Sequence, residues 1–388
     1  MTDKVIVIGA GPAGAALALA LHHAGIDCTV HERDDKPAED GGHLLSVGAN
    51  GLEALAAIGI ELDGIPIPRL PAYSGSGKLL GELANGVVNG SAPTSLLIDR
   101  DTLRRTLQDM LAERGISVEY GKELVSCSAT ADRATAVFGD GTEVHADALI
   151  GADGVHSPTR KALFPDAPAE RFTSILGVAG RAQSDRLSPT PDVVVNVFGH
   201  NAFFSYHAEP DGTVHWLGYA PGGLDKASTK DWKPWLLDVY GRDMAPVREA
   251  LEQTTGPIDI RPVHNVANTT PWQRGRIALI GDAARTATPR IGAGTGLAFE
   301  DAVIIAKCLR DLPSPHAAFP VYQRLRGARV NRVIKWGRLY ARPPKIRTPW
   351  GMWLRDRTWP TMLRAVPSMS SLDWLYQHRV DWPAPVLP

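Results

Sequence analysis

The sequence predicts an α/β protein in which a nucleotide-binding domain carries an inserted antiparallel sheet. Three observations support this fold class. The aliphatic run 5–8 leads directly into Gly9, Gly11 and Gly14 and then into an Ala/Leu-rich helix. Alternating apolar runs divided by Gly and Pro fill the region from about 172 to 266, which is typical of short strands. A buried strand, a second glycine-rich loop and a helix then return after residue 276.

The first stretch has the strand, turn and helix order of a dinucleotide-binding unit. The first glycine permits the tight turn, the second lets a pyrophosphate approach the backbone, and the third lets the helix pack closely on the strand. The diphosphate would then lie on the unpaired N–H groups at the start of the helix, beside Pro12 and Ala13. A second strand, 27–31, ends at Glu32, and Arg33 follows. The carboxylate of Glu32 can accept both hydroxyls of a ribose, although an α/β core that binds no nucleotide is the alternative interpretation.

The composition is that of an ordinary globular protein, with 44% hydrophobic and 21% charged residues, which excludes disordered and collagen-like classes. A chain of 388 residues has room for two domains or slightly more. The three cysteines lie far apart without a C-x-x-C pattern, so neither a disulfide framework nor a zinc site is expected. The first strand starts too early for a signal peptide, and no apolar run approaches the ~20 residues that span a bilayer. We therefore expect a cytoplasmic protein.

Periodicity and Gly or Pro breaks predict the remaining elements. Further helices are expected at residues 49–55, 102–111, 297–309 and 320–340, and further strands at 78–83, 116–120, 148–150, 193–198, 202–207, 213–219 and 276–280. Residues 125–144 are expected to form a hairpin that turns at Gly139, Asp140 and Gly141, where the Asp-Gly step suits a type I′ turn. Residues 281–284 are expected to form a turn, and the chain after about 340 is expected to be irregular.

These elements suggest a discontinuous domain organisation. The predicted nucleotide-binding domain comprises residues 1–72, 96–170 and 272–335, and the predicted substrate-binding sheet domain comprises 73–95 and 171–271. Residues 336–388 form a Trp- and Arg-rich tail.

Three separated motifs carry a resemblance to a known family. They are GAGPAG at 9–14 with Glu32, GADGVHSPTR at 151–160, and GDAARTATPRIGAGTGLAFEDA at 281–302. Their order and spacing resemble the single-component FAD-dependent aromatic hydroxylases, the family of 4-hydroxybenzoate hydroxylase, which also includes tetracycline-inactivating monooxygenases and flavin-dependent urate hydroxylases. The similarity covers roughly residues 3–335. It implies a Rossmann-like FAD-binding domain with an inserted antiparallel β-sheet substrate domain and a C-terminal helical tail.

The resemblance also implies roles for individual residues. Gly9, Gly11 and Gly14 would hold the ADP half of FAD, with Glu32 on its ribose. Arg100 would reach the flavin side of the cofactor, Asp153 would serve FAD and nicotinamide handling, and Asp282 would bind the ribityl chain. As alternatives, the two aspartates could be helix caps or turn residues and Arg100 a solvated helix-start residue.

The glycine-rich loop would face the flavin ring through Pro289, Gly292, Ala293, Gly294 and Thr295. Ser157 and Arg160 are expected to brace the middle motif. The chain departs from the family pattern in carrying Arg285 where relatives usually have His, and Ala293 where they usually have Gln. Arg290 adds a second positive charge before the loop.

The resemblance implies that NAD(P)H reduces FAD and that the reduced flavin takes O₂ to a C4a-hydroperoxide. The distal oxygen would then pass to an electron-rich aromatic or polyketide-like small molecule. Three alternatives stay open: a flavoprotein reductase or dehydrogenase that inserts no oxygen, a flavin-dependent halogenase, and a non-catalytic flavin-binding regulator. A halogenase should carry a Trp-x-Trp-x-Ile-Pro element, which the sequence lacks. The sequence contains no recognised nucleic-acid-binding module.

The inserted sheet is expected to cover the flavin and to supply the substrate pocket. The candidate pocket residues are His207, His215, Trp216 and Tyr219, or the alternate face with Phe203 and Phe204, together with Arg290. His207 or His215 could deprotonate a phenol, because an unperturbed histidine titrates near pH 6.5. A structural role for both histidines is the alternative.

The tail is rich in cations and tryptophan. Between residues 324 and 364 twelve Lys and Arg residues face one acid, Asp356, although the whole chain has a formal net charge of −1. Six of the ten tryptophans lie in the tail: Trp336, Trp350, Trp353, Trp359, Trp374 and Trp382. Such a composition can mark a membrane surface or an anionic partner. The expected interpretation is that the rings pack the tail onto the body while the cations stay in water.

Overall fold

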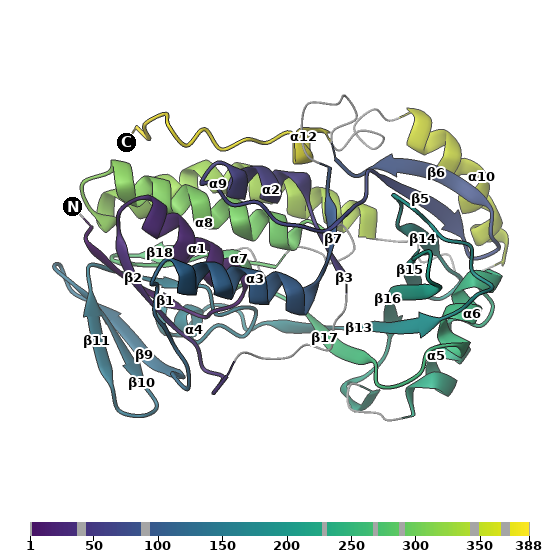
Figure 1. Ribbon diagram of the computed structural model, residues 1–388, viewed down its shortest axis with the longest axis horizontal. Helices are drawn as coiled ribbons and strands as arrows, with labels where there is room; N and C mark the ends of the chain where they lie inside the picture. Colours follow the sequence, from purple (N-terminus) through teal and green to yellow (C-terminus); the bar gives the residue numbers. More distant parts are fainter. Residues whose placement is uncertain are drawn as a thin grey trace.

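The computed structural model describes residues 2–36, 44–86, 94–226, 231–266, 271–286, 292–341, 349–365 and 373–387. Two large sheets organise the chain, one at each end of the molecule (Figure 1).

The first sheet has six strands in the order β18-β19-β12-β1-β2-β8. Their bounds are β1 (Lys4–Ile8), β2 (Asp27–His31), β8 (Val118–Glu119), β12 (Ala148–Gly151), β18 (Gln273–Arg274) and β19 (Ile277–Leu279). All pairs are parallel except β18 with β19. Parallel sheets are covered on both faces, which explains why residues 5–8 are an unbroken aliphatic run and are all buried. The strands predicted at 5–8, 27–31 and 148–150 are confirmed.

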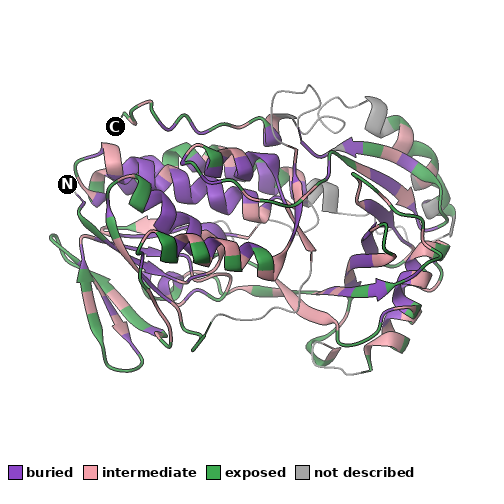
Figure 2. Cartoon of the chain, viewed as in Figure 1, coloured by how far each residue is buried: buried purple, intermediate pink, exposed green. Residues whose placement is uncertain are grey.

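Helices cover this sheet and form most of the buried core (Figure 2). They are α1 (Pro12–His23), α2 (Ala49–Ala56), α3 (Arg100–Glu113), α4 (Pro158–Leu163), α7 (Gly281–Ala284), α8 (Gly294–Asp311) and α9 (Pro315–Ala341). The predicted turn at 281–284 is therefore a short helix, and the helix expected from 320 begins five residues earlier with Pro320 inside it. Helices α2 and α8 cross so closely that glycine is required at the contact, because a Cβ on Gly51 would overlap the backbone of Gly296.

The second sheet has seven strands in the order β17-β13-β16-β15-β14-β5-β6. Their bounds are β5 (Arg69–Ser74), β6 (Leu79–Ala84), β13 (Arg171–Gln183), β14 (Val195–Phe198), β15 (Phe203–Ala208), β16 (Thr213–Pro221) and β17 (Asp259–Asn265). The sequence predicts an antiparallel sheet, but β14 pairs in parallel with β5. The parallel pair arises because β5 precedes the inserted region 171–271 in the sequence and joins its sheet beside β14. The boundary expected between residues 72 and 73 consequently falls inside β5.

Three further elements flank the second sheet: η1 (Leu224–Lys226), α5 (Trp232–Tyr240) and α6 (Ala245–Glu252). The two α-helices cover one face of the sheet, with Phe204, Trp216 and Tyr240 in the core between them.

Two three-stranded sheets complete the fold. One consists of β3 (Leu44–Val47), β7 (Leu96–Asp99) and β4 (Ile65–Pro66), and the other is the meander of β9 (Leu124–Ala129), β10 (Ala134–Phe138) and β11 (Glu143–Ala146). The type I′ turn expected in the meander is wrong. That turn needs a positive φ at both residues of the Asp-Gly step, Asp140 and Gly141, whereas of these two Gly141 alone has one, +84°. The longer loop places the left-handed residue at Gly141, after the turn.

The tail is more regular than expected. Helix α10 (Pro349–Ala365) and the short helix α12 (Asp373–Tyr376) occupy part of the region predicted to be irregular. Helix α10 contains Pro360 and packs against β6. We attribute its formation to this tertiary contact, because helices gain most of their stability from packing rather than from local propensity.

Candidate functional site

The three glycine-bearing motifs converge at the carboxyl ends of three adjacent parallel strands. They follow β1, β12 and β19, which are neighbours in the first sheet. The backbone N–H of Ala152 donates to the carbonyl of Ile8 at 2.8 Å, and that of Ile280 donates to Gly151 at 3.0 Å. A Cβ on Gly281 would contact the side chain of Ala13 at 3.3 Å. Open α/β sheets bind ligands at this edge.

The glycines of the first motif differ in what surrounds them. Gly9 has a φ of +101°, and a Cβ there would lie 2.7 Å from the carbonyl oxygen of Ala152. A Cβ on Gly14 would lie 1.8 Å from the carbonyl oxygen of Gly9. By contrast, no described atom lies within 4 Å of a Cβ placed on Gly11. The first and third glycines therefore permit backbone contacts within the protein, and Gly11 borders open space.

The start of α1 is open to an anion. Gly11 is its N-cap and Pro12 its first residue, and in the described part of the chain no side chain caps it. Its first turn carries no acid, so no side chain of the helix itself offsets the positive end of the helix dipole.

Glu32 lies at the end of β2 and holds the glycine loop. Its Oε2 accepts a hydrogen bond from the backbone N–H of Ala10 at 2.8 Å, and its Oε1 accepts one from Asp34 at 3.2 Å. A carboxylate has about four acceptor positions, so further hydrogen bonds can form. Arg33 is exposed and lies 3.8 Å from the Asp34 carboxylate.

In the second motif, Asp153 is bonded mainly to its own loop. Its carboxylate accepts hydrogen bonds from the Ser157 hydroxyl at 2.5 Å and from the N–H and hydroxyl of Thr159 at 2.9 and 2.7 Å. Burial raises the pKa of Asp153, and these hydrogen bonds oppose the rise. Ser157 also caps α4, and buried Arg160 donates to the carbonyl of Ala283 at 2.9 Å. Ser157 and Arg160 thus brace the motif and connect it to the third one.

The third motif presents an accessible carboxylate. Asp282 follows β19 and its residue is exposed, whereas Gly281, Ala283 and Ala284 are buried. Desolvation by the surrounding protein nevertheless raises the pKa of Asp282, while the guanidinium groups of Arg285 and Arg100 act in the opposite direction. The sequence-predicted residues Arg100 and Asp282 are thus close enough to interact electrostatically. Arg100 is the first residue of α3, next to the cap residue Asp99.

Arg285 is a buried cation with incomplete hydrogen bonding. Its Nη1 pairs with Asp301 at 2.8 Å and donates to the carbonyl of Gly281 at 3.1 Å, and its guanidinium lies 4.8 Å from the ring centre of Trp272. Its Nε and Nη2 have no hydrogen-bond partner among the described residues. Unpaired buried donors cost about 1–3 kcal/mol each. The Nε and Nη2 of Arg285 are therefore donors that a bound group could satisfy.

A buried ion-pair network supports the third motif from behind. Arg326 pairs with both Glu300 and Asp301, and Arg329 pairs with Glu300 at 2.7 Å. Burial alone would raise the pKa of Glu300, but Arg326 and Arg329 bring it down to about 2. Arg329 also donates to the carbonyl of Leu375 at 2.7 Å, so the network joins α8, α9 and the C-terminal segment.

None of the sequence motifs predicts this network. The signal was there in the adjacent acids Glu300 and Asp301, which interrupt an otherwise apolar helix face, because buried acids require cationic partners. The identity of those partners, however, depends on the packing of α9 on α8.

The glycine-rich loop leads into α8. Ala293 is the N-cap of this 18-residue helix, and no side chain caps it in the described part of the chain. Gly292 has a φ of +60°, and Thr295 lies in the first turn. A Cβ on Gly294 would meet no atom of the described residues within 4 Å. Pro289 and Arg290 lie outside the described residues.

Strand alternation divides the predicted substrate residues between two faces of the second sheet. Phe203 pairs with Tyr219 across β15 and β16, and their rings stack at 6.0 Å. Phe204 and Trp216 point to the opposite face, where they stack at 5.6 Å in the core beneath α5 and α6. The expectation that Phe204 and Trp216 line a pocket is therefore wrong, because neighbours in a strand point to opposite faces.

The face of the second sheet that carries Phe203 turns toward the domain that contains the first sheet. Arg181 on β13 shares this face, and its guanidinium lies 3.8 Å from Asp99, the residue before α3. An apolar cluster forms on the same face and includes Phe198, Phe203, Leu217 and Tyr219, with Trp359 of α10 packed against it.

His207 and His215 share that face and pair across the strands, but both are bonded to protein groups. The Nδ1 of His207 lies 2.9 Å from the carbonyl of Val193, and the Nε2 of His215 lies 2.8 Å from the Glu209 carboxylate. Desolvation and the nearby Arg181 lower the pKa of His215, and Glu209 opposes this effect. Both residues are buried, which favours a structural role.

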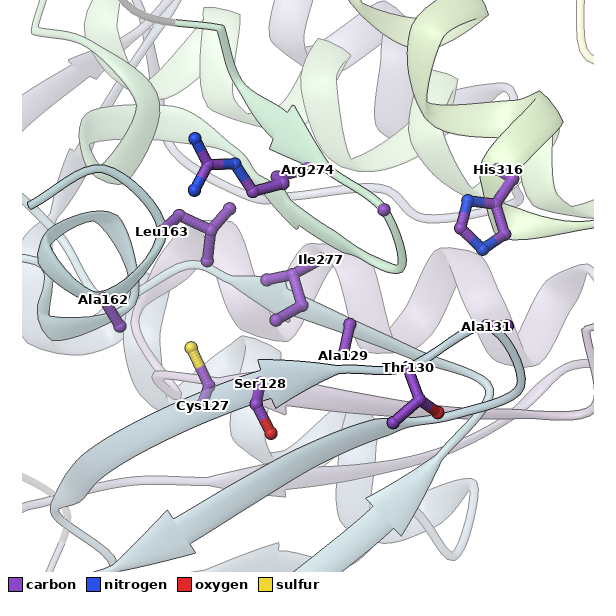
Figure 3. Close-up of a pocket in the computed structure, with 11 residues that line it drawn as sticks. Cys127, Ser128, Ala129, Thr130, Ala131, Ala162, Leu163, Arg274, Ile277 and His316 are labelled. Atoms are coloured by element: carbon purple, nitrogen blue, oxygen red, sulfur yellow. The ribbon is translucent and has the colours of Figure 1, made fainter.

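A cavity of about 380 Å³ lies between the meander and the end of α4 (Figure 3). Its lining includes Cys127 and Thr130 of the meander, Leu163 at the end of α4, and His316. Ile277, which also lines it, is the first residue of β19, so the cavity lies at the opposite end of this strand from Asp282. Burial raises the pKa of the Cys127 thiol to about 12, which disfavours the nucleophilic thiolate at neutral pH.

Comparison with known proteins places these features in a family. Residues 2–335 match the family described as "FAD binding domain". The chain is 31% identical over 376 residues to a FAD-dependent urate hydroxylase of Klebsiella pneumoniae, covering 92% of this chain and 95% of the relative. It is 28% identical over 386 residues to the 2-heptyl-3-hydroxy-4(1H)-quinolone synthase of Pseudomonas aeruginosa, covering 94% and 95%. The structure of Klebsiella pneumoniae HpxO with FAD and uric acid matches with a TM-score of 0.79 at 26% identity, covering 94% of this chain and 93% of that one.

The family match extends from just before the first strand to the C-terminal third of α9 and includes all three motifs. It confirms the resemblance drawn from those motifs and FAD as the cofactor. The chain belongs to the FAD-binding-domain family of flavin-dependent hydroxylases and monooxygenases.

Proposed function

We propose that this protein is a FAD-dependent, NAD(P)H-consuming monooxygenase that hydroxylates an aromatic or polyketide-like small molecule. The observation that carries the proposal is the convergence of three motifs at the carboxyl ends of β1, β12 and β19. The relatives support the substrate class, since one is named a urate hydroxylase and another a heptyl-hydroxyquinolone synthase. Within that class we favour an electron-rich heteroaromatic or hydroxylated ring.

The residues at the motifs fit FAD. Open space at Gly11 and the uncapped start of α1 suit a diphosphate, because backbone N–H groups and the helix dipole both favour an anion there. The Glu32 carboxylate, which already fixes the loop through Ala10, would accept the ribose hydroxyls. We propose the backbone around Pro12 and Ala13 as part of the same site.

The flavin half would be held by the second and third motifs. Asp282 has an accessible carboxylate beside Arg100 and Arg285, so it would accept hydrogen bonds from the ribityl hydroxyls while Arg100 lies on the same side. The uncapped start of α8, from Gly292 to Thr295, would present N–H groups to the ring, and Pro289 belongs to the same proposed site. We propose that Asp153 acts mainly by holding its loop, since Ser157 and Thr159 donate three hydrogen bonds to its carboxylate.

Bound FAD would supply the redox chemistry, taking hydride from NAD(P)H and activating O₂ for transfer of one oxygen atom. The chain itself would bind and orient the cofactor and the substrate, and it would exclude water from them. The positive end of α8 would stabilise negative charge on the bound flavin ring. The buried network behind Asp301 holds Gly281 through a hydrogen bond of 3.2 Å, which keeps the third motif in place.

The substrate would lie against the Phe203 face of the second sheet. Phe203, Tyr219 and Phe198 offer aromatic surfaces on this face, and aromatic pairs contribute about 0.5–1.5 kcal/mol beyond their buried area. We assign no proton transfer to His207 or His215, because each is buried and bonded to a protein acceptor. Arg290 stays a proposed substrate residue on sequence grounds alone.

The test is oxygen uptake by the purified flavoprotein with NADH or NADPH across phenols, hydroxyquinolines, purines and polyketides. The proposal expects a substrate that stimulates NAD(P)H and O₂ consumption together and gains one oxygen atom by mass. Stimulated NAD(P)H consumption without O₂ uptake identifies a reductase or dehydrogenase instead. A flavoprotein that never oxidises NAD(P)H is a regulator, and a halide-dependent product identifies a halogenase.

A further inference from the structure

We propose that the outward face of α10 docks onto an anionic lipid bilayer surface. Four residues define this face: Trp350, Trp353, Leu354 and Arg357. Their spacing of three and four residues places them on one side of the helix. Trp350 is 70% exposed, Trp353 55% and Leu354 37%. Two tryptophans and a leucine thus form an apolar stripe in water, and such stripes mark interaction surfaces.

The opposite side of α10 is anchored to the protein. Trp359 packs against Phe198 with ring centres 4.8 Å apart, and Lys78 donates to the carbonyl of Asp356 at 2.7 Å. The helix lies beside β6 at the end of the molecule remote from the meander β9–β11 (Figure 1). Because this contact orients the helix, the outward face points away from the protein body.

The other tail tryptophans behave as the sequence predicts. Trp336 and Trp374 pack with ring centres 6.3 Å apart, and Trp382 is buried beside His23 and the Arg310 guanidinium. The expectation that the rings pack the tail onto the body is therefore confirmed for these residues and for Trp359. It is wrong for Trp350 and Trp353, which require a different explanation.

The charge pattern favours a lipid surface over a protein partner. Helix α10 carries three arginines and one acid, within the segment 324–364 that has twelve Lys and Arg. The Arg357 guanidinium lies 5.5 Å from the ring centre of Trp353, so the cation and the indole occupy the same level. Indoles prefer the membrane–water interface, and basic residues are attracted to anionic headgroups.

The geometry supports a helix that lies on the bilayer rather than one that crosses it. No helix in the described ranges is long and apolar enough to span a membrane. An interfacial helix instead buries its apolar face at the headgroup level and keeps its polar contacts on the other side. The contacts of Trp359 and Asp356 with the sheet match this arrangement.

The experiment is co-sedimentation of the full-length flavoprotein with vesicles of phosphatidylcholine alone or mixed with phosphatidylglycerol, at low and high salt. We expect binding to the mixed vesicles that weakens with salt. The double variant W350S/W353S should bind about 10- to 100-fold more weakly, given the apolar area removed. The variant R357Q should bind about fivefold more weakly to anionic vesicles. Because these side chains are exposed, thermal unfolding should be unchanged.

The matched control is L224S/L325S, which removes two exposed leucines on η1 and α9 and should bind like the parent. The proposal is overturned if the protein binds neither vesicle type, or if the two double variants lose the same amount of vesicle binding. Sedimentation velocity without lipid tests whether a second copy of the chain binds this face instead. A dimer that dissociates in the W350S/W353S variant would assign the face to self-association and would also overturn the proposal.

Discussion

Alanine substitutions at Gly11 and Gly14 separate ligand space from protein packing in the first motif. The two residues lie three positions apart, and the structure gives them opposite surroundings. A Cβ on Gly11 meets no described atom within 4 Å, whereas a Cβ on Gly14 would lie 1.8 Å from the carbonyl oxygen of Gly9. If Gly11 borders the diphosphate, the two substitutions should affect stability and FAD binding differently.

The expected magnitudes follow from these contacts. Cβ atoms essentially never approach other heavy atoms within 3.0 Å, so G14A must move α1 away from Gly9 by about 1.2 Å. Such overpacking costs about 1–3 kcal/mol. Gly11 has a φ of −65°, which alanine adopts without strain, so G11A should leave the flavin-free protein as stable as before or raise its stability by about 0.4–1 kcal/mol. With FAD present, the added methyl group should weaken binding by about 5- to 150-fold.

The assay combines urea unfolding of flavin-free protein with FAD titration followed by flavin fluorescence. The control is G327A in α9, where a Cβ meets no described atom within 4 Å. It should gain about 0.5–1 kcal/mol from helix propensity and keep its FAD affinity. A G11A protein that binds FAD like the parent would falsify the placement of the diphosphate at this glycine. Loss of stability in G11A equal to that in G14A would refute the claim that the space beside Gly11 is open.

Three further predictions address the core, the buried network and the tail. F204A should destabilise the protein by about 3–5 kcal/mol, because Phe204 is fully buried beneath α5 and α6. F203L should instead cost under about 1.5 kcal/mol of stability and change the KM for the substrate. Urea unfolding and substrate kinetics check both variants, and a stable F204A protein contradicts the assigned faces. Arg326 and Arg329 bring the pKa of Glu300 in the folded protein to about 2, against an ordinary 4.5. The ionised carboxylate therefore adds about 3 kcal/mol to the free energy of unfolding above pH 4.5, and this contribution is lost as the pH falls toward 2. E300Q should lack this pH dependence in urea titrations and lose about 3–5 kcal/mol of stability at neutral pH. Desolvation, with Arg329 and Arg326, lowers the pKa of His378 from 6.5 to about 4 despite the nearby Glu300. As the pH drops from 6.5 to 4, the unfolded chain therefore takes up a proton before the folded protein does. The free energy of unfolding should fall by roughly 1–2 kcal/mol over this range, after allowance for solvent screening. H378Q should flatten thermal unfolding across that range, and an unchanged slope there would contradict the neutral state of His378.

Much of the nucleotide-binding half could be predicted from the sequence because its signals are local. An aliphatic run that ends in Gly9, Gly11 and Gly14 specifies a strand, a turn and a helix within a few residues. Asp282 and Glu32 could be placed at strand ends for the same reason, since Glu32 follows β2 directly and Asp282 lies three residues after the end of β19. Parallel strands then bring their carboxyl ends to one edge of the sheet.

The second sheet shows where local signals fail. Its strands could be recognised, but the apolar residues on both sides left open which face forms the core. The addition of α5 and α6 decides this, because it buries Phe204 and Trp216 and leaves Phe203 and Tyr219 on the face toward the first domain. The joining of β5 and β6 to this sheet likewise depends on a pairing between residues more than a hundred positions apart.

The sequence by itself determined that the chain forms a dinucleotide-binding α/β domain, because the turn chemistry of the glycines and the hydrophobic runs are encoded in neighbouring residues. Only the tertiary structure decided the partners of buried charges and the orientation of the tail. Glu300 and Asp301 find Arg326 through the packing of α9 on α8, and Trp350 and Trp353 are exposed because Trp359 anchors the other side of their helix. These outcomes depend on long-range contacts, which residue spacing along the chain does not specify.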